Sequence, residues 1–449
     1  MSTASEPITH QDDRIVVLDV MRGIAVLGIL LMNITGFGLP QAYDDPTNWG
    51  GHEGANLLVW RIDALLFEGT MRGLFTLLFG ASALLFLQRH GASFGRRPAT
   101  LYFRRMFWLI VFGLVNGYVL LWDGDILFFY GLCGLPLYMF RNLPARRLMI
   151  IATVVMALQT VVTVVEWVGY HEMREQAQIA EVKRAAGIAL SADEEEAVAT
   201  YVATSSDFKP GRSDLEAMVA NIGHSYTSAL RTISNRTWYV ETRFFFRHGL
   251  LECLGMMLLG MALWKMGVLT GAATTRVYVA MIALGYALGL AVNTFEVREL
   301  EQAGFATDAL VSSYLTYDLG RIPMTLGHLG LIAVVYRSQF FPAAMRALAA
   351  VGRMALTNYL SHSVICMFLF TGAGLALYGQ LERHALYYIV IAIWIAQLIW
   401  SPLWLRHFYF GPAEWLWRSL TYWRKQPMRR DAAAPTLALP RRPGEGTGT

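Results

Sequence analysis

The sequence predicts an all-α polytopic membrane protein with about ten transmembrane helices and both termini in the cytoplasm. Hydrophobic residues make up 55% of the 449 residues and charged residues only 16%, against about 45–50% and about 25% in soluble domains. Ten stretches are apolar over about the 20 residues that a transmembrane helix needs. Lysine and arginine are concentrated in every second gap between these stretches, which fixes the predicted orientation.

The predicted spans occupy residues 15–39, 64–88, 102–122, 124–141, 148–168, 243–265, 275–295, 309–336, 354–378 and 385–405. The gaps after the second, fourth, sixth and eighth spans are basic, whereas residues 40–56 and 296–308 are mainly acidic. Basic short loops face the cytoplasm, so the span count is even and both ends lie inside. The net charge of +4 therefore reflects topology and contact with anionic lipid, not binding of nucleic acid.

The chain divides into a polar lead (1–13), a transmembrane domain (14–422) and a tail (423–449). Within the domain, residues 170–240 are polar enough to lie outside the bilayer. They predict amphipathic helices on the extracytoplasmic face, either as a lid over the spans or as a solvated connector. Residues 243–422 form the C-terminal membrane region. The tail is rich in Pro, Ala, Gly and Arg, which predicts a disordered cytoplasmic segment.

The three cysteines, Cys133, Cys253 and Cys366, all lie in apolar segments. This pattern predicts free, buried thiols that pack as small hydrophobic side chains. Neither a disulfide framework nor a metal site is indicated.

Polar groups recur along one side of the first span. Asp19 and Arg22 are three residues apart and can meet on one helix face, and a structural ion pair at the inner boundary is the plain interpretation. Asn33 follows Arg22 by eleven residues, which is about three helical turns. The three side chains therefore form a stripe that suits a helix lining a cavity.

A histidine and a carboxylate follow the first span on the predicted outer side. His52 lies in a loop, and Asp63 lies eleven residues later near the start of the second span. An imidazole oriented by a carboxylate is a common general base. An isolated surface histidine without a role is the alternative.

Two carboxylates, Asp123 and Asp125, flank Gly124 in an outward-facing turn that begins the fourth span. Either one could cap the following helix. Together, beside Trp122 and Tyr130, they could instead hold a polar headgroup.

The eighth span carries Asp318, Arg321 and His328, with Pro323 between them. Asp318 and Arg321 can pair at i,i+3, and proline should kink the helix. Charged, broken helices at membrane depth are tolerated only beside protein or water, so this segment predicts a polar cavity.

The ninth span opens with two polar stripes. Arg353, Thr357 and Ser361 recur every four residues, and Asn358 and His362 form the neighbouring stripe. Their spacing places both stripes on one side of a helix, where they could contribute to binding in the same cavity.

Four segments resemble a known group: RIVVLDVMRGIAVLGILLMN (14–33), GDILFFYG (124–131), GRMALTNYLSHS (352–363) and GPAEWLWRSLTY (411–422). They look like the YeiB-type bacterial membrane proteins, whose C-terminal half is a domain of unknown function. That family is similar to the transmembrane acyltransferases, including the heparan-α-glucosaminide N-acetyltransferase and acyltransferase-3 groups. Those enzymes move an acyl group from cytoplasmic acyl-CoA to an extracytoplasmic acceptor.

The resemblance implies roles for three residues. The acyltransferase-3 group has a histidine eleven residues after the arginine of span one, where this chain has Asn33, as the glucosaminide group does. The glucosaminide group places its active histidine in the loop after that span, about ten residues before an aspartate. His52 would then act as base or acyl acceptor, Asp63 would orient it, and Asn33 would donate to the oxyanion.

The resemblance also implies acyl-CoA as donor, with Arg22 and either Arg321 or Arg353 binding its phosphates, and a location in the bacterial cytoplasmic membrane. The acceptor would be a small molecule, glycan or lipid, and no metal is expected. A transporter of a small metabolite is the second hypothesis, because the charged eighth span suits a site at the membrane midplane. An envelope scaffold or sensor is the third. A homo-oligomer remains open in all three.

Overall fold

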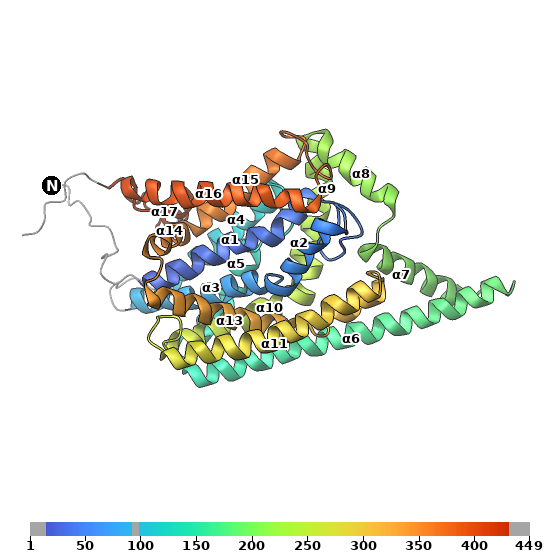
Figure 1. Ribbon diagram of the computed structural model, residues 1–449, viewed down its shortest axis with the longest axis horizontal. Helices are drawn as coiled ribbons and strands as arrows, with labels where there is room; N and C mark the ends of the chain where they lie inside the picture. Colours follow the sequence, from blue (N-terminus) through green and yellow to red (C-terminus); the bar gives the residue numbers. More distant parts are fainter. Residues whose placement is uncertain (1–14, 92–97, 431–449) are drawn as a thin grey trace, which may run out of the picture.

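The computed structural model describes residues 15–91 and 98–430, and their regular structure is helical throughout. Figure 1 shows the helices gathered into one bundle along its long axis. The helices are α1 (Val16–Gly38), α2 (Gly54–Leu66), α3 (Thr70–Gly91), α4 (Pro98–Tyr118), α5 (Leu127–Phe140), α6 (Ala145–Ala185), α7 (Ala192–Phe208), α8 (Arg212–His224), α9 (Tyr226–Tyr239), α10 (Leu250–Lys265), α11 (Thr275–Gln302), α12 (Thr307–Ser313), α13 (Tyr317–Ser338), α14 (Pro342–Arg353), α15 (Ala355–Phe370), α16 (Arg383–His407) and α17 (Pro412–Tyr422), with a π-helical turn (Val240–Gly249) joining α9 to α10.

Within residues 15–91 and 98–430, eight helical segments are long and apolar enough to cross a membrane, judged by length and composition. They include or overlap eight of the predicted spans. The other two predicted spans coincide with shorter apolar helices, α5 and α15. The chain is therefore an all-α, multi-pass membrane protein, and the count of ten remains a prediction.

Helix α1 lies at the centre of the bundle and packs against α3, α14, α15 and α16. Its sequence is apolar around nearly the whole circumference, which is typical of a fully enclosed helix. Val20, Met21, Ala25, Val26 and Leu30 are completely buried. This central position makes α1 the element that both ends of the bundle share.

Helices α3 and α10 cross at a pair of glycines. A Cβ added to Gly80 would lie 2.0 Å from the carbonyl oxygen of Met257, and one added to Gly260 would lie 1.9 Å from that of Leu77. Only glycine lets these two backbones approach so closely.

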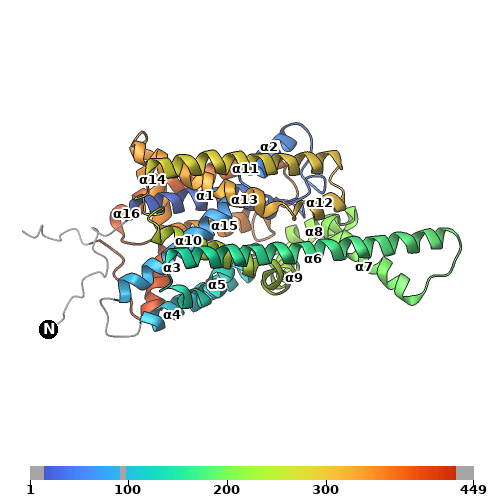
Figure 2. The same ribbon diagram turned by 90° about the horizontal axis from the view of Figure 1, so that it is seen from below.

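The segment after the fifth span departs from the prediction. Helix α6 does not end near residue 168 but continues to Ala185, so its 41 residues reach about 60 Å, twice the hydrocarbon thickness of about 30 Å. Figure 2 shows its far end projecting beyond the other helices, with α7 beside it. The predicted insertion at 170–240 therefore begins inside a continuous helix.

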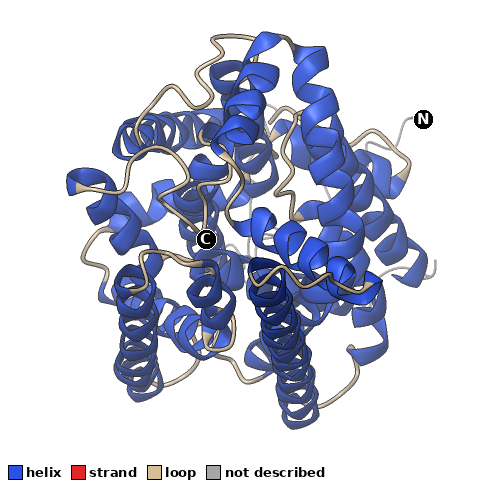
Figure 3. Ribbon diagram, turned by 90° about the vertical axis from the view of Figure 1, so that its right-hand side faces the viewer, coloured by secondary structure: helices blue, strands red, loops and turns tan. Residues whose placement is uncertain are grey.

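The α7–α8 connection packs against the loop that follows α1. The side-chain amide of Asn48 donates to the carbonyl oxygen of Phe208 at 3.1 Å, and Lys209 pairs with the buried Asp45 at 3.5 Å. These contacts favour the lid interpretation over a free connector. Figure 3 looks onto this end of the bundle, where helices and loops cover the interior.

Part of the tail was predicted wrongly. Residues 423–430 are ordered, and Arg430 donates its backbone N–H to the carbonyl oxygen of His407 at 2.9 Å. Phe408 and Arg429 form an isolated antiparallel bridge. The return of the chain onto the end of α16 explains this order. Residues 431–449 and the polar lead lie outside the described residues.

The two ends of the bundle are named here by the predicted orientation. The inner end holds the start of α1, α14 and α17, and the outer end holds α2, α8 and α12 (Figures 1 and 2). The described chain begins at residue 15 and finishes at residue 430 at this same end of the bundle, in agreement with the charge pattern.

This orientation gives a labelling prediction. In a variant lacking Cys133, Cys253 and Cys366, a cysteine at the exposed Glu196 should react with an impermeant maleimide added to whole cells, whereas one at the exposed Lys425 should not. Permeabilised cells provide the control, since both positions should then react. Labelling of position 425 from outside would reverse the orientation.

Candidate functional site

A small cavity at the outer end of the bundle, here named the outer vestibule, is lined by both charged and apolar side chains. Its volume is about 80 Å³, which leaves room for several water molecules but is smaller than the roughly 300–1,000 Å³ of typical drug-sized ligand sites. The lining residues are Met32, Thr35, Tyr43, Asp44, Trp60, Asp63, Ala64, Glu68, Glu296, Val297, Leu300, Leu310, Ser313, Tyr314, Tyr317 and Arg383.

The vestibule is strongly acidic. Four carboxylates, Asp44, Asp63, Glu68 and Glu296, line it beside one guanidinium, that of Arg383. They come from separate elements: the loop after α1, α2, the α2–α3 turn, α11 and the start of α16. No group of three or more carboxylate, imidazole or thiol side chains is arranged to hold a metal ion within residues 15–91 and 98–430.

Asp44 is the carboxyl group best placed for proton transfer. Its side chain is exposed and lines the vestibule, and Tyr314 donates a hydrogen bond to it at 3.4 Å. Desolvation by the surrounding protein, and next the negative charge of Glu68, raise the pKa of Asp44 to about 7, against the opposing effects of Tyr314 and Arg72. A carboxyl group that titrates near neutral pH suits a general base.

The raised pKa makes a signed prediction about stability. Between about pH 4 and pH 7 the folded protein holds a proton on Asp44 that the unfolded chain has lost, so stability falls as pH rises through this window. Asp44→Asn removes the penalty. The difference in unfolding temperature between Asp44→Asn and the wild type should therefore grow in favour of the variant from pH 5 to pH 8 in detergent micelles. A difference that does not change with pH would contradict the raised pKa of Asp44.

Below the vestibule, a buried ion-pair network runs toward the middle of the bundle. Arg321 is 2% exposed and pairs with Glu252 at 2.8 Å and with Asp318, while Arg72 pairs with the same Glu252 at 3.2 Å. The predicted Asp318–Arg321 pair is confirmed. Arg321 is thus held by two carboxylates, which keeps it from acting as a phosphate ligand for CoA.

Tyrosine connects this network to the vestibule. The Tyr317 hydroxyl donates to Glu68 at 2.8 Å and accepts from Arg72 at 3.3 Å, and the Arg321 guanidinium lies 4.6 Å from the Tyr317 ring. Gly69 allows the approach, since its φ is +64° and a Cβ there would collide with both Arg321 and Tyr317. The network thereby fixes the floor of the vestibule.

The structure separates the predicted catalytic residues. Asp63 is buried and accepts a hydrogen bond from Tyr387, whereas His52 is exposed on the loop and makes no hydrogen bond or ion pair with the described part of the chain. The expected His52–Asp63 pair is absent, because the hydroxyl of Tyr387 in α16 donates its hydrogen bond to the Asp63 carboxylate. Asn33 is half-buried, and Thr35 lines the vestibule in its place.

Arg22 lies at the inner end, where arginines gather. It pairs with Asp19 at 3.0 Å, as predicted. The Arg105 guanidinium lies in the electrostatic field of both Arg418 and Arg22 and stacks 3.6 Å from the Trp417 ring. Arg22, Arg105 and Arg418 are here named the inner arginine cluster. Guanidiniums that act on one another electrostatically create a positive potential suited to phosphates.

Asp123 and Asp125 have structural partners. Asp123 pairs with Arg236 of α9 at 2.6 Å. Asp125 is buried and accepts from the Phe128 backbone N–H at 2.8 Å and from the Asn116 side chain at 2.8 Å. The capping interpretation therefore fits Asp125, and neither residue lines the vestibule.

The remaining candidates lie between helices. Both ring nitrogens of His328 are engaged, Nδ1 by Tyr286 and Nε2 by the carbonyl oxygen of Leu66, each at 2.8 Å. Asn358 and His362 are buried at the α15–α16 contact, where Nε2 of His362 contacts Gln397 at 3.2 Å and Asn358 bonds Ser401 at 3.1 Å. Arg353 is half-buried at the end of α14.

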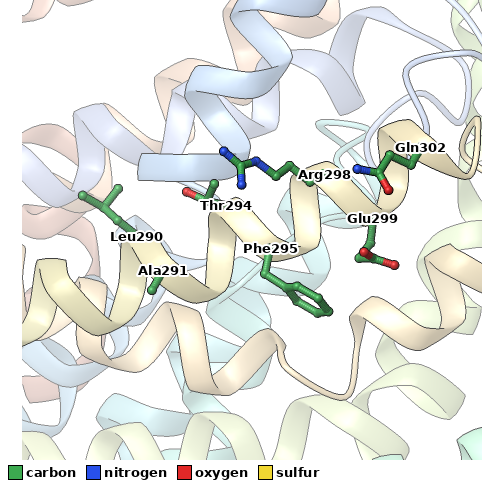
Figure 4. A pocket seen from close by; sticks show the side chains of 7 residues that line it. All are labelled: Leu290, Ala291, Thr294, Phe295, Arg298, Glu299 and Gln302. Carbon is green, nitrogen blue, oxygen red and sulfur yellow. The ribbon is translucent and has the colours of Figure 1, made fainter.

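A larger hollow, of about 640 Å³, lies along the outer half of α11. Its seven lining residues all belong to that one helix, and Figure 4 shows Phe295 and Arg298 pointing away from each other. Thr294, Arg298, Glu299 and Gln302 are polar, but no second element contributes a polar group that would converge with them. It is therefore a feature of the bundle surface and not a second site.

Sequence reasoning missed several residues of the site. Arg72 and Glu252 are ionisable groups inside predicted spans, and this signal alone marks functional candidates. Arg383 lies just before the tenth predicted span. Asp44 entered the sequence analysis only as part of the acidic gap 40–56, which was used to predict the orientation. Their grouping depends on helix packing between α1, α3, α10, α13 and α16, which local spacing does not reveal.

Comparison with known proteins gives a family and relatives. A family described as a protein of unknown function (DUF418) matches residues 263–424. The chain is 31% identical over 419 residues to the uncharacterized protein YeiB of Escherichia coli, covering 91% of this chain and 96% of that protein. It is 29% identical over 447 residues to the uncharacterized protein YxaH of Bacillus subtilis, covering 96% and 99%. No solved structure gives a significant match.

Proposed function

Because the chain belongs to the YeiB family of multi-pass membrane proteins, we propose that it is an acyltransferase of the bacterial cytoplasmic membrane. It transfers an acyl group from cytoplasmic acyl-CoA to an acceptor that enters the outer vestibule from the extracytoplasmic side. The observation that carries the proposal is the pairing of an acidic, outward cavity containing Asp44 with an arginine cluster at the opposite end of the bundle.

Asp44 supplies the acid–base chemistry in place of His52. Its carboxylate takes a proton from the acceptor amine or hydroxyl as the nucleophile attacks the thioester carbonyl carbon. The C–S bond then breaks, and the CoA thiolate leaves toward the cytoplasm. A base with a pKa of about 7 combines a useful ionised fraction with sufficient basicity at neutral pH.

The donor is held from the inner end. Guanidinium groups bind phosphates through charge-assisted hydrogen bonds, and the inner arginine cluster would hold the nucleotide part of CoA. Arg22 and Thr35 are 13 residues apart on α1, which is about 20 Å along the helix. An extended pantetheine arm is of comparable length and could bring the thioester to the vestibule.

The reaction requires the packing around α1 to open. Val26 and Leu30, which lie between Arg22 and Thr35, are fully buried in the core. A passage for the pantetheine arm would form if neighbouring helices moved away from this part of α1. Conformational steps of this kind limit the rate of many enzymes.

The test uses purified protein in lipid nanodiscs, where both faces are accessible. Acetyl-CoA and a panel of small amines and alcohols are supplied, and the release of free CoA thiol and the mass of the acceptor are followed. Acceptor-dependent thiol release with an acetylated product supports the proposal. Failure of acetyl-CoA and longer acyl-CoA donors to release thiol with any acceptor would contradict it.

Transport of a small metabolite is the second candidate, favoured by the ion-pair network that continues from the vestibule into the membrane. Ionisable groups at such depth commonly mark substrate or proton pathways. In sealed proteoliposomes, uptake of an unmodified labelled acceptor without acyl-CoA would favour transport. Either function places the protein in contact with the bilayer, and a homo-oligomer is compatible with both.

A further inference from the structure

The buried guanidinium of Arg383 marks an anion-binding position within the otherwise acidic vestibule. Arg383 is 2% exposed and lines the cavity. One terminal nitrogen donates to the carbonyl oxygen of Ala42, but its Nε–H has no hydrogen-bond partner. An unsatisfied, buried donor on a charged group is costly, so a ligand that accepts this hydrogen bond would stabilise the folded protein.

The surrounding carboxylates do not satisfy Arg383. No ion pair joins it to an acidic side chain among the described residues, and the nearby Asp63 accepts its hydrogen bond from Tyr387 instead. Arg383 is also the first residue of the 25-residue helix α16, whose N-terminal end carries a partial positive charge. Both features favour an anionic group at this wall of the vestibule.

The other walls favour a cation. Asp44, Glu68 and Glu296 line the same cavity from the loop after α1, the α2–α3 turn and α11. Because the cavity holds only about 80 Å³, a small ligand that fills it must meet Arg383 and these carboxylates together. A simple amine would leave the guanidinium unsatisfied, and a simple carboxylate would face three acidic groups.

We infer that the outer vestibule binds a small zwitterion of the α-amino acid class, with its carboxylate on Arg383 and its ammonium group toward Asp44, Glu68 and Glu296. The inference deepens the proposed function, on which it rests for the identity of this ligand as the acyl acceptor. Within that function, Asp44 would take one proton from the ammonium group as the amine becomes the nucleophile, and the second nitrogen-bound proton would pass to the CoA thiolate as the C–S bond breaks. The size of the cavity limits the side chain to about that of glycine or alanine.

The test is calorimetric binding of glycine to the purified full chain in nanodiscs without acyl-CoA, compared with ethylamine and acetate. Glycine should bind, and each single-charge compound should bind at least tenfold more weakly. Arg383→Gln should weaken glycine binding by about 10- to 100-fold, since a hydrogen bond to a charged group is lost. Arg383→Lys should recover part of this loss. Arg406→Gln, at the exposed far end of the same helix, should leave binding unchanged.

Equal binding of ethylamine and glycine by the wild-type protein would overturn the inference, and this comparison does not depend on any variant folding correctly. Arg383-dependent glycine binding without acyl transfer would sustain the zwitterion site while removing the transferase. Acyl transfer that proceeds equally well with amine acceptors that have and lack a carboxylate would sustain the transferase and remove the zwitterion site.

Discussion

Asp44→Asn should reduce acyl transfer by about 10²–10⁴-fold, the usual contribution of a positioned general base. Asparagine preserves the size of the side chain and can still accept the hydrogen bond from Tyr314, so folding and donor binding should persist. In the wild-type protein the rate should rise with pH through about 7, as Asp44 loses its proton. The measurement is acceptor-dependent thiol release across this pH range.

His52→Ala is the matched control, because His52 is an exposed residue of the same loop. It should retain the wild-type rate and pH profile. The opposite pattern, with full activity in Asp44→Asn and loss in His52→Ala, would restore the histidine as base and require the loop to rearrange during the reaction. Tyr314→Phe should change the pH profile modestly, because Asp44 would lose a donor that stabilises its charged form.

Most of the fold could be predicted because membrane helices are specified locally. A segment such as 15–39 must satisfy its backbone within itself and offer an apolar surface to lipid or to other helices, so composition alone identifies it. The errors occurred where helices change environment along their length. Helix α6 leaves the membrane without a break, and the eighth predicted span is divided into α12 and α13 near the bundle surface.

The site was harder to predict because it depends on contacts between distant segments. Pairs at i,i+3, such as Asp19–Arg22 and Asp318–Arg321, follow from helix geometry and are present. The pairing of His52 with Asp63 was inferred from a loop spacing, and the structure gives that carboxylate to Tyr387, which is 324 residues away. The resemblance directed attention to the outer end of the protein, where the vestibule lies, and packing determines which side chains meet there.

Arg321→Met should destabilise the protein by about 3–5 kcal/mol, the cost of removing one partner from a buried ion pair. The substitution keeps most of the side-chain volume but leaves Asp318 without its cation, while Glu252 retains Arg72. Loss of the contact with the Tyr317 ring should also loosen the floor of the vestibule. Thermal unfolding in detergent micelles, monitored together with ligand binding, measures both effects.

The double variant Arg321→Met, Asp318→Leu separates lost pairing from lost packing. Replacing both partners by apolar groups removes the uncompensated charge, so much of the stability should return, although the contact with Tyr317 remains absent. Arg337→Met, at the exposed end of the same helix, should change stability by less than about 1 kcal/mol. If Arg321→Met reduced stability as little as Arg337→Met does, water would have to screen the charges of the buried ion-pair network. The ion pairs would then be a hydrated pathway into the membrane, as transport requires, and not a rigid support for the vestibule.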